Sequence, residues 1–299
     1  MPKFSRKKRE NASNFDNKNW WEQNPMQYNW DDTENWINRT PEIQKTEKSF
    51  FESIDKKFFS ISKVFNKKGE LPFSNLIDFQ KLENKKILEI GCGFGSHAQL
   101  IINNSKNIDY TGIDITKTAV DFAKRRFKLF NLSGKIIECD AEKLPFQDNQ
   151  FDFIWSWGVI HHSKNTEIIL NEIKRVLKPD GSCTLMIYNK NSLRYYLYGG
   201  LFHGIMCLKL LKKNLDEINM EFTDGYFARH FTSKEFKKIL LRKRFKVKKI
   251  FSLAETDHIP FPGGYRLKKL KINFLNQLIE KLLNKFGWFL IATFKKDKN

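Results

Sequence analysis

The chain has 299 residues, of which 40% are hydrophobic and 14% aromatic, so it is long and apolar enough to bury a substantial core. Its formal net charge of +19 is uneven, because residues 182–299 carry 24 Lys and Arg against nine Asp and Glu. A basic half suits nucleic acid, an anionic membrane surface or an acidic substrate. Solvated helix faces are the simpler interpretation here, since most of the charge lies in lysine runs.

The cysteines and the first residues indicate a cytoplasmic protein. The four cysteines are too widely spread for a disulfide framework or a metal cluster, and we expect them to be reduced: Cys92, Cys139, Cys183 and Cys207. The N-terminus is charged and lacks the apolar core of a secretory signal. No run reaches the roughly 18 uncharged apolar residues that a membrane-spanning helix needs.

The N-terminal third contains no predicted strand before residue 84. Residues 1–19 are polar and basic and are predicted to be disordered, whereas residues 20–83 are predicted to form a helical segment. Two groups of aromatic residues stand out in that segment: Trp20, Trp21, Tyr28 and Trp30, then Phe50, Phe51, Phe58 and Phe59. The first group either closes over an active site as a lid or packs the segment onto the core, and both interpretations remain open.

From residue 84 short apolar strands alternate with amphipathic helices. Strands are predicted at 85–90, 108–115, 135–140, 151–157 and 182–189, and helices between them at 97–104, 117–130 and 166–177. This alternation favours a parallel sheet with right-handed crossovers.

Residues 191–299 add two further strands and two helical insertions. The strands are predicted at 245–253 and 287–294, and the insertions at 191–244 and 254–286. The apolar stretch 192–211 is expected to form a buried or surface-lying helix. The predicted fold is therefore α/β, a Rossmann-like, mostly parallel seven-stranded sheet with helices on both faces. Its core would be 84–190, with helical cap insertions and the last two strands in 191–299.

A glycine-rich loop follows the first strand. Gly91, Gly93 and Gly95 follow Glu89 and precede a predicted helix. In parallel sheets ligands bind beyond the carboxyl ends of the strands, and glycines let the backbone approach them closely.

Two acidic positions indicate that the ligand contains adenosine. Asp114 ends the second strand, 23 residues after Gly91, where a carboxylate can accept hydrogen bonds from two ribose hydroxyls. Asp140 follows the third strand and can accept from an adenine amine, with the Ala141 N–H facing a ring nitrogen. Ser96 replaces the third glycine of a dinucleotide fingerprint, and the loop holds no Lys or Arg for a diphosphate. A ligand without phosphates fits better.

These motifs together resemble the class I S-adenosylmethionine-dependent methyltransferases. The segments are "ILEIGCGFG", "GIDIT", "CDAEKLPFQDNQFDFIWSWGVIHH" and "EIKRVLKPDG". They are closest to the type-11 group, which includes ubiquinone/menaquinone C-methyltransferase-like enzymes, and the resemblance covers about 84–190. It departs at Asp180, where the family often has a second glycine.

The resemblance implies S-adenosyl-L-methionine as the cofactor. The cofactor-binding residues predicted in this way are Glu89, Gly91, Gly93, Gly95, Asp114, Ile115, Asp140, Ala141, Trp157 and Gly158. The glycines and Glu89 would surround the methionine moiety, while Trp157 and Gly158 would lie near the sulfonium and the methyl acceptor. A final antiparallel strand is also implied, for which 287–294 is the candidate.

Methyl transfer requires alignment more than catalysis by side chains, because the sulfonium is already activated. If the acceptor loses a proton, the candidate bases are His162 and, second, His161. The candidate substrate contacts are Trp21, Tyr28, Tyr188 and His230. Tyr195, Tyr196, Tyr198, Arg229, Asp257, His258 and Arg266 are weaker candidates.

We predict a small-molecule methyl acceptor. A membrane lipid or quinone is the alternative, with the basic half and 192–211 in peripheral contact with an anionic membrane. Nucleic acid is less favoured, because the chain has "SWGVIHH" where base-amine methyltransferases usually carry N/D-P-P-Y/F. A binding module without activity is disfavoured by the intact Asp114 and Asp140. Neither the acceptor atom nor the oligomeric state can be inferred from the sequence.

Overall fold

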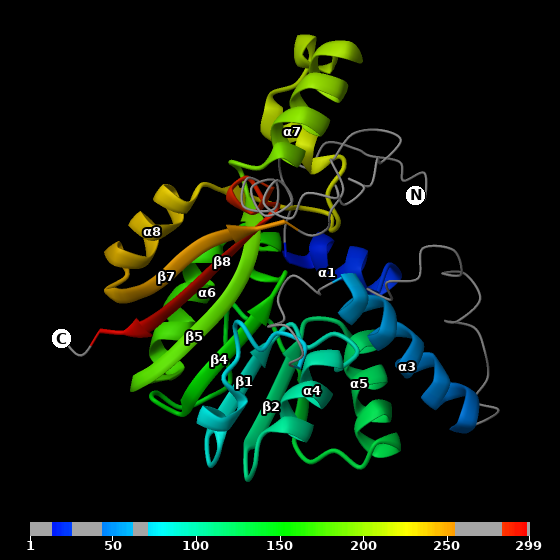
Figure 1. The fold of residues 1–299 in the computed structure, drawn as a ribbon, viewed down its shortest axis with the longest axis vertical. Helices are drawn as coiled ribbons and strands as arrows, with labels where there is room; N and C mark the ends of the chain where they lie inside the picture. The colour runs from blue at the N-terminus through cyan, green and yellow to red at the C-terminus, as the bar shows by residue number, and fades with distance from the viewer. Residues whose placement is uncertain (1–13, 26–43, 62–70, 255–282, 298–299) are drawn as a thin grey trace, which may run out of the picture.

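A computed structural model of the protein describes residues 14–25, 44–61, 71–254 and 283–297, and an eight-stranded sheet lies at its centre (Figure 1). The strand order is β3-β2-β1-β4-β5-β8-β7, and β6 pairs with β5 off this path. The strands are β1 (Lys86–Ile90), β2 (Asp109–Asp114), β3 (Lys135–Glu138), β4 (Phe151–Trp157), β5 (Leu177–Asn189), β6 (His230–Phe231), β7 (Phe245–Leu253) and β8 (Phe289–Lys296).

The predicted α/β fold is confirmed, with one additional strand. Strands β1 to β5 pair in parallel, and β8 is antiparallel to both β5 and β7, as expected for 287–294. The eighth strand is the two-residue β6, which pairs in parallel with Tyr188 and Asn189. Two residues are too short to carry a periodic pattern, so the sequence could not reveal this strand.

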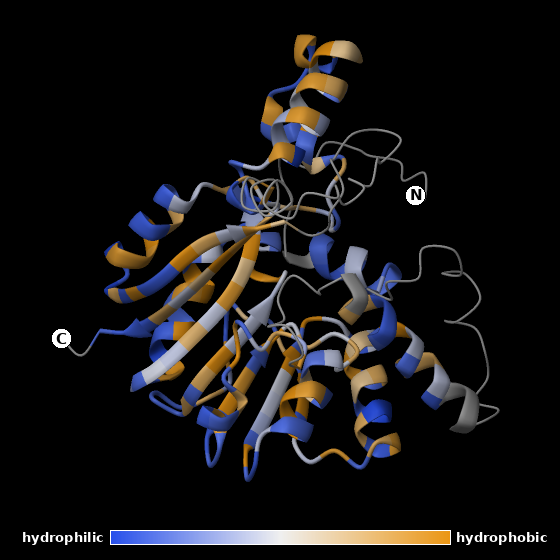
Figure 2. Cartoon of the chain, in the orientation of Figure 1, coloured by the Kyte–Doolittle hydropathy of each residue, from blue (hydrophilic) through white to orange (hydrophobic). Residues whose placement is uncertain are grey.

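Helices cover both faces of the sheet (Figures 1 and 2). On one face lie α4 (Ser96–Asn104) and α5 (Lys117–Leu129), whose apolar side chains join those of β1 and β2 in one buried cluster. On the other lie α6 (Thr166–Val176) and α8 (Ser233–Arg242), in a second cluster with β4, β5 and β8. Helical periodicity predicts this arrangement, since each helix presents one apolar stripe to the sheet.

The junction between α6 and β5 differs from the expected turn. Residues 178–181 were predicted to separate the helix from a strand starting at 182, but β5 begins at Leu177, directly after α6. The pairing of β4 with β5 is irregular between Phe151 and Phe153, so the extra extended residues are accommodated as a bulge.

The N-terminal segment is attached to the sheet by two helices. Helix α1 covers Asn14–Gln23, so the prediction of disorder is wrong for residues 14–19; residues 1–13 lie outside the described residues. The Asn17 Nδ2 donates to the His162 carbonyl at 2.8 Å, and one Glu22 carboxylate oxygen accepts from the Thr118 N–H at 2.9 Å. These contacts order a stretch whose composition alone indicates disorder.

Helix α3 (Gln44–Ile61) packs by its aromatic stripe. Phe50, Phe51 and Phe58 are buried, as the helical spacing predicts. An ion pair also fixes the position of α3 against α5. The fully buried Arg126 guanidinium of α5 donates to both Asp55 carboxylate oxygens at 2.7 and 3.0 Å. Breaking a buried pair leaves an unpaired charge, so this contact specifies where α3 sits.

The first insertion forms a helical hairpin. A π-helix, η4 (Arg194–Met206), is followed by the short 3₁₀ turn η5 (Lys209–Leu211) and by α7 (Leu215–Met220). The helix expected within 192–211 is therefore present, partly exposed and of π type. Of the second insertion, residues 255–282 lie outside the described residues. No helix in the part of the chain that the structure describes has both the length and the apolar character to cross a membrane.

Candidate functional site

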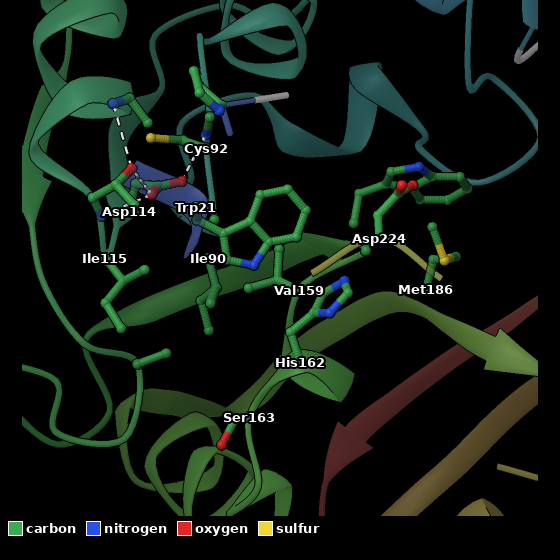
Figure 3. A pocket seen from close by; sticks show the side chains of 18 of the residues that line it. Trp21, Ile90, Cys92, Asp114, Ile115, Val159, His162, Ser163, Met186 and Asp224 are labelled. Carbon is green, nitrogen blue, oxygen red and sulfur yellow. Dashed lines mark hydrogen bonds between the residues drawn. The ribbon is translucent and has the colours of Figure 1, made fainter. Parts of the chain in front are cut away.

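A cavity of about 480 Å³ lies beyond the carboxyl ends of β1, β2 and β4 (Figure 3). The strand order reverses between β1 and β4, which is where open parallel sheets bind ligands. In Figure 3, Asp114 and Asp224 lie on opposite sides of Trp21, Val159 and His162, and all five residues line the cavity.

The glycine loop lines the end of the cavity at which Asp114 lies, here called the first end; the second end is the one at which Asp224 lies. Gly91 and Gly93 have φ of +75° and +52°, a backbone conformation that other residues rarely adopt. A Cβ on Gly91 would lie 2.2 Å from the Val159 Cγ2, so the loop after β4 packs directly on it. A Cβ on Gly93 would meet no atom within 4 Å, so this position opens into the cavity.

Asp114 is held rigidly at the end of β2. One carboxylate oxygen accepts from the backbone N–H and the hydroxyl of Thr116 at 3.0 and 2.8 Å, and the other accepts from the Gly93 N–H at 3.1 Å. Burial raises the pKa of Asp114, while these three donors oppose the rise. The carboxylate is thus an oriented acceptor that retains lone pairs for a ligand.

Most of the predicted cofactor residues line the cavity: Gly91, Gly93, Asp114, Ile115, Asp140, Ala141, Trp157 and Gly158. Glu89 and Gly95 do not. Glu89 is buried, accepts a hydrogen bond from the Tyr110 hydroxyl and lies 3.4 Å from the His97 Nδ1. Gly95 instead precedes α4 as its N-cap.

His97 reaches the cavity although sequence reasoning missed it. Its ring lies edge-on to Phe58, Phe73 and Trp155, with centroids 4.8–5.4 Å apart. The only sequence signal for it is a histidine in the first turn of the helix that follows the glycine loop.

His162 faces the second end of the cavity. Its Nδ1 lies 2.8 Å from the Phe227 carbonyl, so this nitrogen carries the hydrogen and Nε2 carries the lone pair. Burial lowers the pKa of His162 to about 4, against a smaller rise from that hydrogen bond. The ring is therefore neutral at physiological pH, and Trp21 packs edge-on against it at 5.2 Å.

His161 does not reach the cavity, contrary to its prediction as a candidate base. It is fully buried, neither ring nitrogen has a partner, and its ring packs on His162 and Tyr188 at 4.2 and 4.0 Å. The 3₁₀ turn η3 (Ile160–His162) explains the difference, because adjacent residues in a turn point in different directions.

Only two of the four predicted substrate contacts are found at the cavity. Trp21 and Tyr188 line the cavity, but His230 does not. His230 is buried behind Tyr188, with the two rings stacked at 5.8 Å, and burial lowers its pKa to about 3. Tyr28 lies outside the described residues.

Of the weaker candidates, the four that the structure describes do not line the cavity: Tyr195, Tyr196, Tyr198 and Arg229. Tyr195 is buried and donates to Asp216, and the Arg229 guanidinium lies over the Phe231 ring. The other three, Asp257, His258 and Arg266, lie outside the described residues, as does Trp30 of the first aromatic group.

The first insertion contributes two charged residues to the cavity that sequence reasoning did not select. Asp224 and Arg194 both line it, and burial raises the pKa of Asp224 while the nearby Arg194 charge opposes that rise. The Arg194 guanidinium lies 4.9 Å from the centre of the Trp288 ring and donates to the Phe222 carbonyl. The available signal was a lone arginine interrupting an apolar stretch.

Known proteins similar to this chain include methyltransferases, in agreement with the position of the cavity at the ends of the strands. Residues 88–185 match the type-11 family described as "Methyltransferase domain". Residues 88–185 therefore form a methyltransferase domain of the type-11 group. The domain is 33% identical over 100 residues to a fatty-acid O-methyltransferase of Mycolicibacterium smegmatis, which is 33% of this chain and 36% of that protein.

A second relative and one solved structure complete the comparison. A probable phthiotriol/phenolphthiotriol dimycocerosates methyltransferase of Mycobacterium ulcerans is 33% identical over 33% of this chain and 38% of its own length. The chain thus spans little more than a third of the length of these relatives. An S-adenosylmethionine-dependent methyltransferase from Mesorhizobium loti has the same fold, with a TM-score of 0.52 and 14% identity over 77% of this chain and 99% of its own.

The buried histidines predict a loss of stability on mild acidification. His230 has a pKa of about 3 in the folded protein and about 6.5 when unfolded, so the unfolded chain binds more protons between these values. Its contribution to stability is complete above about pH 6.5 and is lost as the pH falls toward 3. His230→Phe should reduce the pH dependence of the free energy of unfolding by up to about 1.4 kcal/mol per pH unit.

Urea unfolding at pH 7.5, 6.0 and 5.0 measures this dependence. An unchanged slope in the variant would mean that His230 is protonated in the folded protein, contrary to its burial.

Proposed function

We propose that the protein is an S-adenosyl-L-methionine-dependent methyltransferase that transfers a methyl group to a small-molecule acceptor by in-line displacement. The observation that carries this proposal is the continuity of one cavity. The glycine loop, Asp114 and Asp140 form one end of it, and His162 with Asp224 forms the other. Donor and acceptor could therefore meet without either leaving the cavity.

The first end fits an adenosyl group. Asp114 offers oriented lone pairs for ribose hydroxyls, and Asp140 and Ala141 line the wall predicted for adenine. The space above Gly93 is open, and any side chain at this position would fill it. A glycine here therefore leaves room for a ligand in direct contact with the backbone. Among the lining residues that the structure describes, Arg194 is the one Lys or Arg, and it belongs to the acceptor end. This favours a cofactor without phosphates over a dinucleotide.

The bound cofactor would supply a methyl group already activated on a sulfonium. The protein would then exclude water and align the acceptor, a role that suits the aromatic rings around the second end. Trp21, Trp157, Tyr188 and Trp288 all line the cavity. Trp21 comes from α1, so the N-terminal segment supplies part of this enclosure as well as packing on the core.

Two groups at the acceptor end could receive a proton. The neutral His162 offers its Nε2 lone pair, but a pKa of about 4 makes it a weak base that suits orienting an acceptor hydroxyl or amine. The Asp224 carboxylate is the other candidate, because burial raises its pKa and so makes it a better proton acceptor than an ordinary aspartate.

A membrane lipid or quinone is the second candidate acceptor. The two relatives described above are named for fatty-acid and phthiotriol/phenolphthiotriol substrates, and the acceptor end is rich in aromatic side chains. We place the protein in the cytoplasm, which is supported by its four free cysteines. Nucleic acid remains the less favoured acceptor.

Asp114→Ala should weaken binding of S-adenosyl-L-methionine by about 1–3 kcal/mol, because charge-assisted hydrogen bonds to the ribose would be lost. Isothermal calorimetry on the purified protein measures this directly. The matched control is Asp109→Ala, which removes an exposed carboxylate from the opposite end of β2 and should leave affinity unchanged. Equal affinity of Asp114→Ala and the unmodified protein would refute the ribose assignment.

Asp224→Asn separates proton transfer from cofactor binding. The amide keeps the size of the side chain but cannot accept a proton, so transfer should fall by about 10²–10⁴-fold if Asp224 is the base. Affinity for S-adenosyl-L-methionine should stay within about twofold, since Asp224 lies at the acceptor end. Transfer at the unmodified rate would exclude Asp224 as the base and leave His162 as the candidate.

A further inference from the structure

The hairpin of η4 and α7 projects from the body of the molecule, at the top of Figure 1. We define its tip as residues 201–213, which join the end of η4 to the start of α7. Figure 2 shows apolar residues along this projection. The tip belongs to neither the sheet nor the walls of the cavity.

The inner face of the hairpin is tightly packed. A Cβ on Gly199 would lie 2.2 Å from the Asn219 Oδ1, and one on Gly204 would lie 3.0 Å from the Leu210 side chain. The Asn219 Nδ2 also donates to the Tyr195 carbonyl. Small residues of η4 are therefore packed against α7 and η5.

The outer face of the tip exposes an unusual amount of apolar surface. Ile205, Met206, Leu208 and Leu211 are 59%, 61%, 64% and 78% exposed. Leu201 and Leu210 are exposed as well. Single exposed leucines are ordinary, but six large apolar side chains within one projecting segment mark an interaction surface.

The charge of the tip indicates which kind of partner binds its apolar surface. Residues 201–213 contain Lys209, Lys212 and Lys213 and no carboxylate. Lys209 and Lys213 both pair with the single carboxylate of Glu221, so the tip retains a positive charge. Apolar side chains flanked by lysines are the composition of segments that insert between lipid headgroups, where the ammonium groups meet anionic phosphates.

We propose that the tip docks onto an anionic lipid bilayer and inserts its apolar side chains among the headgroups. The docking site goes beyond the proposed function and stands without it. One consequence does rest on that function. Arg194 begins η4, and Phe222, Thr223 and Asp224 follow α7, so both arms of the hairpin lead to the acceptor end of the cavity. Docking by the tip would favour an acceptor drawn from the bilayer.

Sedimentation with vesicles tests the docking. The full-length protein should sediment with vesicles of phosphatidylcholine and phosphatidylglycerol at 7:3, but much less with pure phosphatidylcholine or in 0.5 M salt. Ile205→Glu/Leu211→Glu should reduce the bound fraction at least tenfold. The matched control is Leu71→Glu/Leu241→Glu, which places two carboxylates at exposed apolar positions on the body and should bind as the unmodified protein does.

A fluorescent probe on Cys207 tests independently whether the tip itself enters the bilayer. It is the exposed cysteine of the four, and burial raises the pKa of the next most accessible thiol, Cys139, to about 11, so an environment-sensitive thiol probe should label Cys207 selectively. Its emission should shift to the blue with anionic vesicles.

Absence of sedimentation, or equal sedimentation of the tip variant and its control, would overturn the proposal. Concentration-dependent self-association that only the tip variant abolishes, without vesicle binding, would assign the surface to a second copy instead and overturn it too. Calorimetry with S-adenosyl-L-methionine on the same samples keeps failure of docking distinct from failure of the proposed function.

Discussion

One backbone carbonyl holds the candidate site to the sheet. The Ile113 carbonyl, at the end of β2, accepts hydrogen bonds from the N–H groups of both Gly91 and Cys92, at 2.8 and 2.9 Å. The glycine loop cannot move away from β2 without breaking both bonds. The next residue, Asp114, then binds the Gly93 N–H, so the loop and the carboxylate that face the ligand position each other. Such preorganisation matters because methyl transfer depends on alignment.

The parts of the site that the sequence predicted are those built from short, ordered segments of the core. Asp114 lines the cavity because it ends a parallel strand beside the one that precedes Gly91, and strands that are consecutive in the chain are usually neighbours in the sheet. Glu89, also predicted to contact the cofactor, does not line the cavity, and the reason is local. Its side chain contacts the Tyr110 hydroxyl of the neighbouring strand, and a motif does not reveal which face of a buried strand a residue occupies.

The acceptor end was much less predictable. Arg194 and Asp224 come from a helical hairpin 30 residues apart in sequence, and no spacing rule relates them to each other or to the core. The sequence also could not tell which of two adjacent histidines would line the cavity. His161 and His162 were both plausible, and only His162 faces it. Under the proposed function the two roles divide along the chain: the core would bind the cofactor, and the first insertion and helix α1 would enclose the acceptor.

The most direct test of the central claim is transfer of a labelled methyl group. Purified protein would be incubated with methyl-labelled S-adenosyl-L-methionine and an extract of cells that lack this protein, and the label then sorted into small molecules, lipid, nucleic acid and protein. We predict label in the small-molecule or lipid fraction, above the level in extract alone. No transfer above that level, from protein shown by calorimetry to bind the cofactor, would contradict the assignment of an enzyme and favour a binding module.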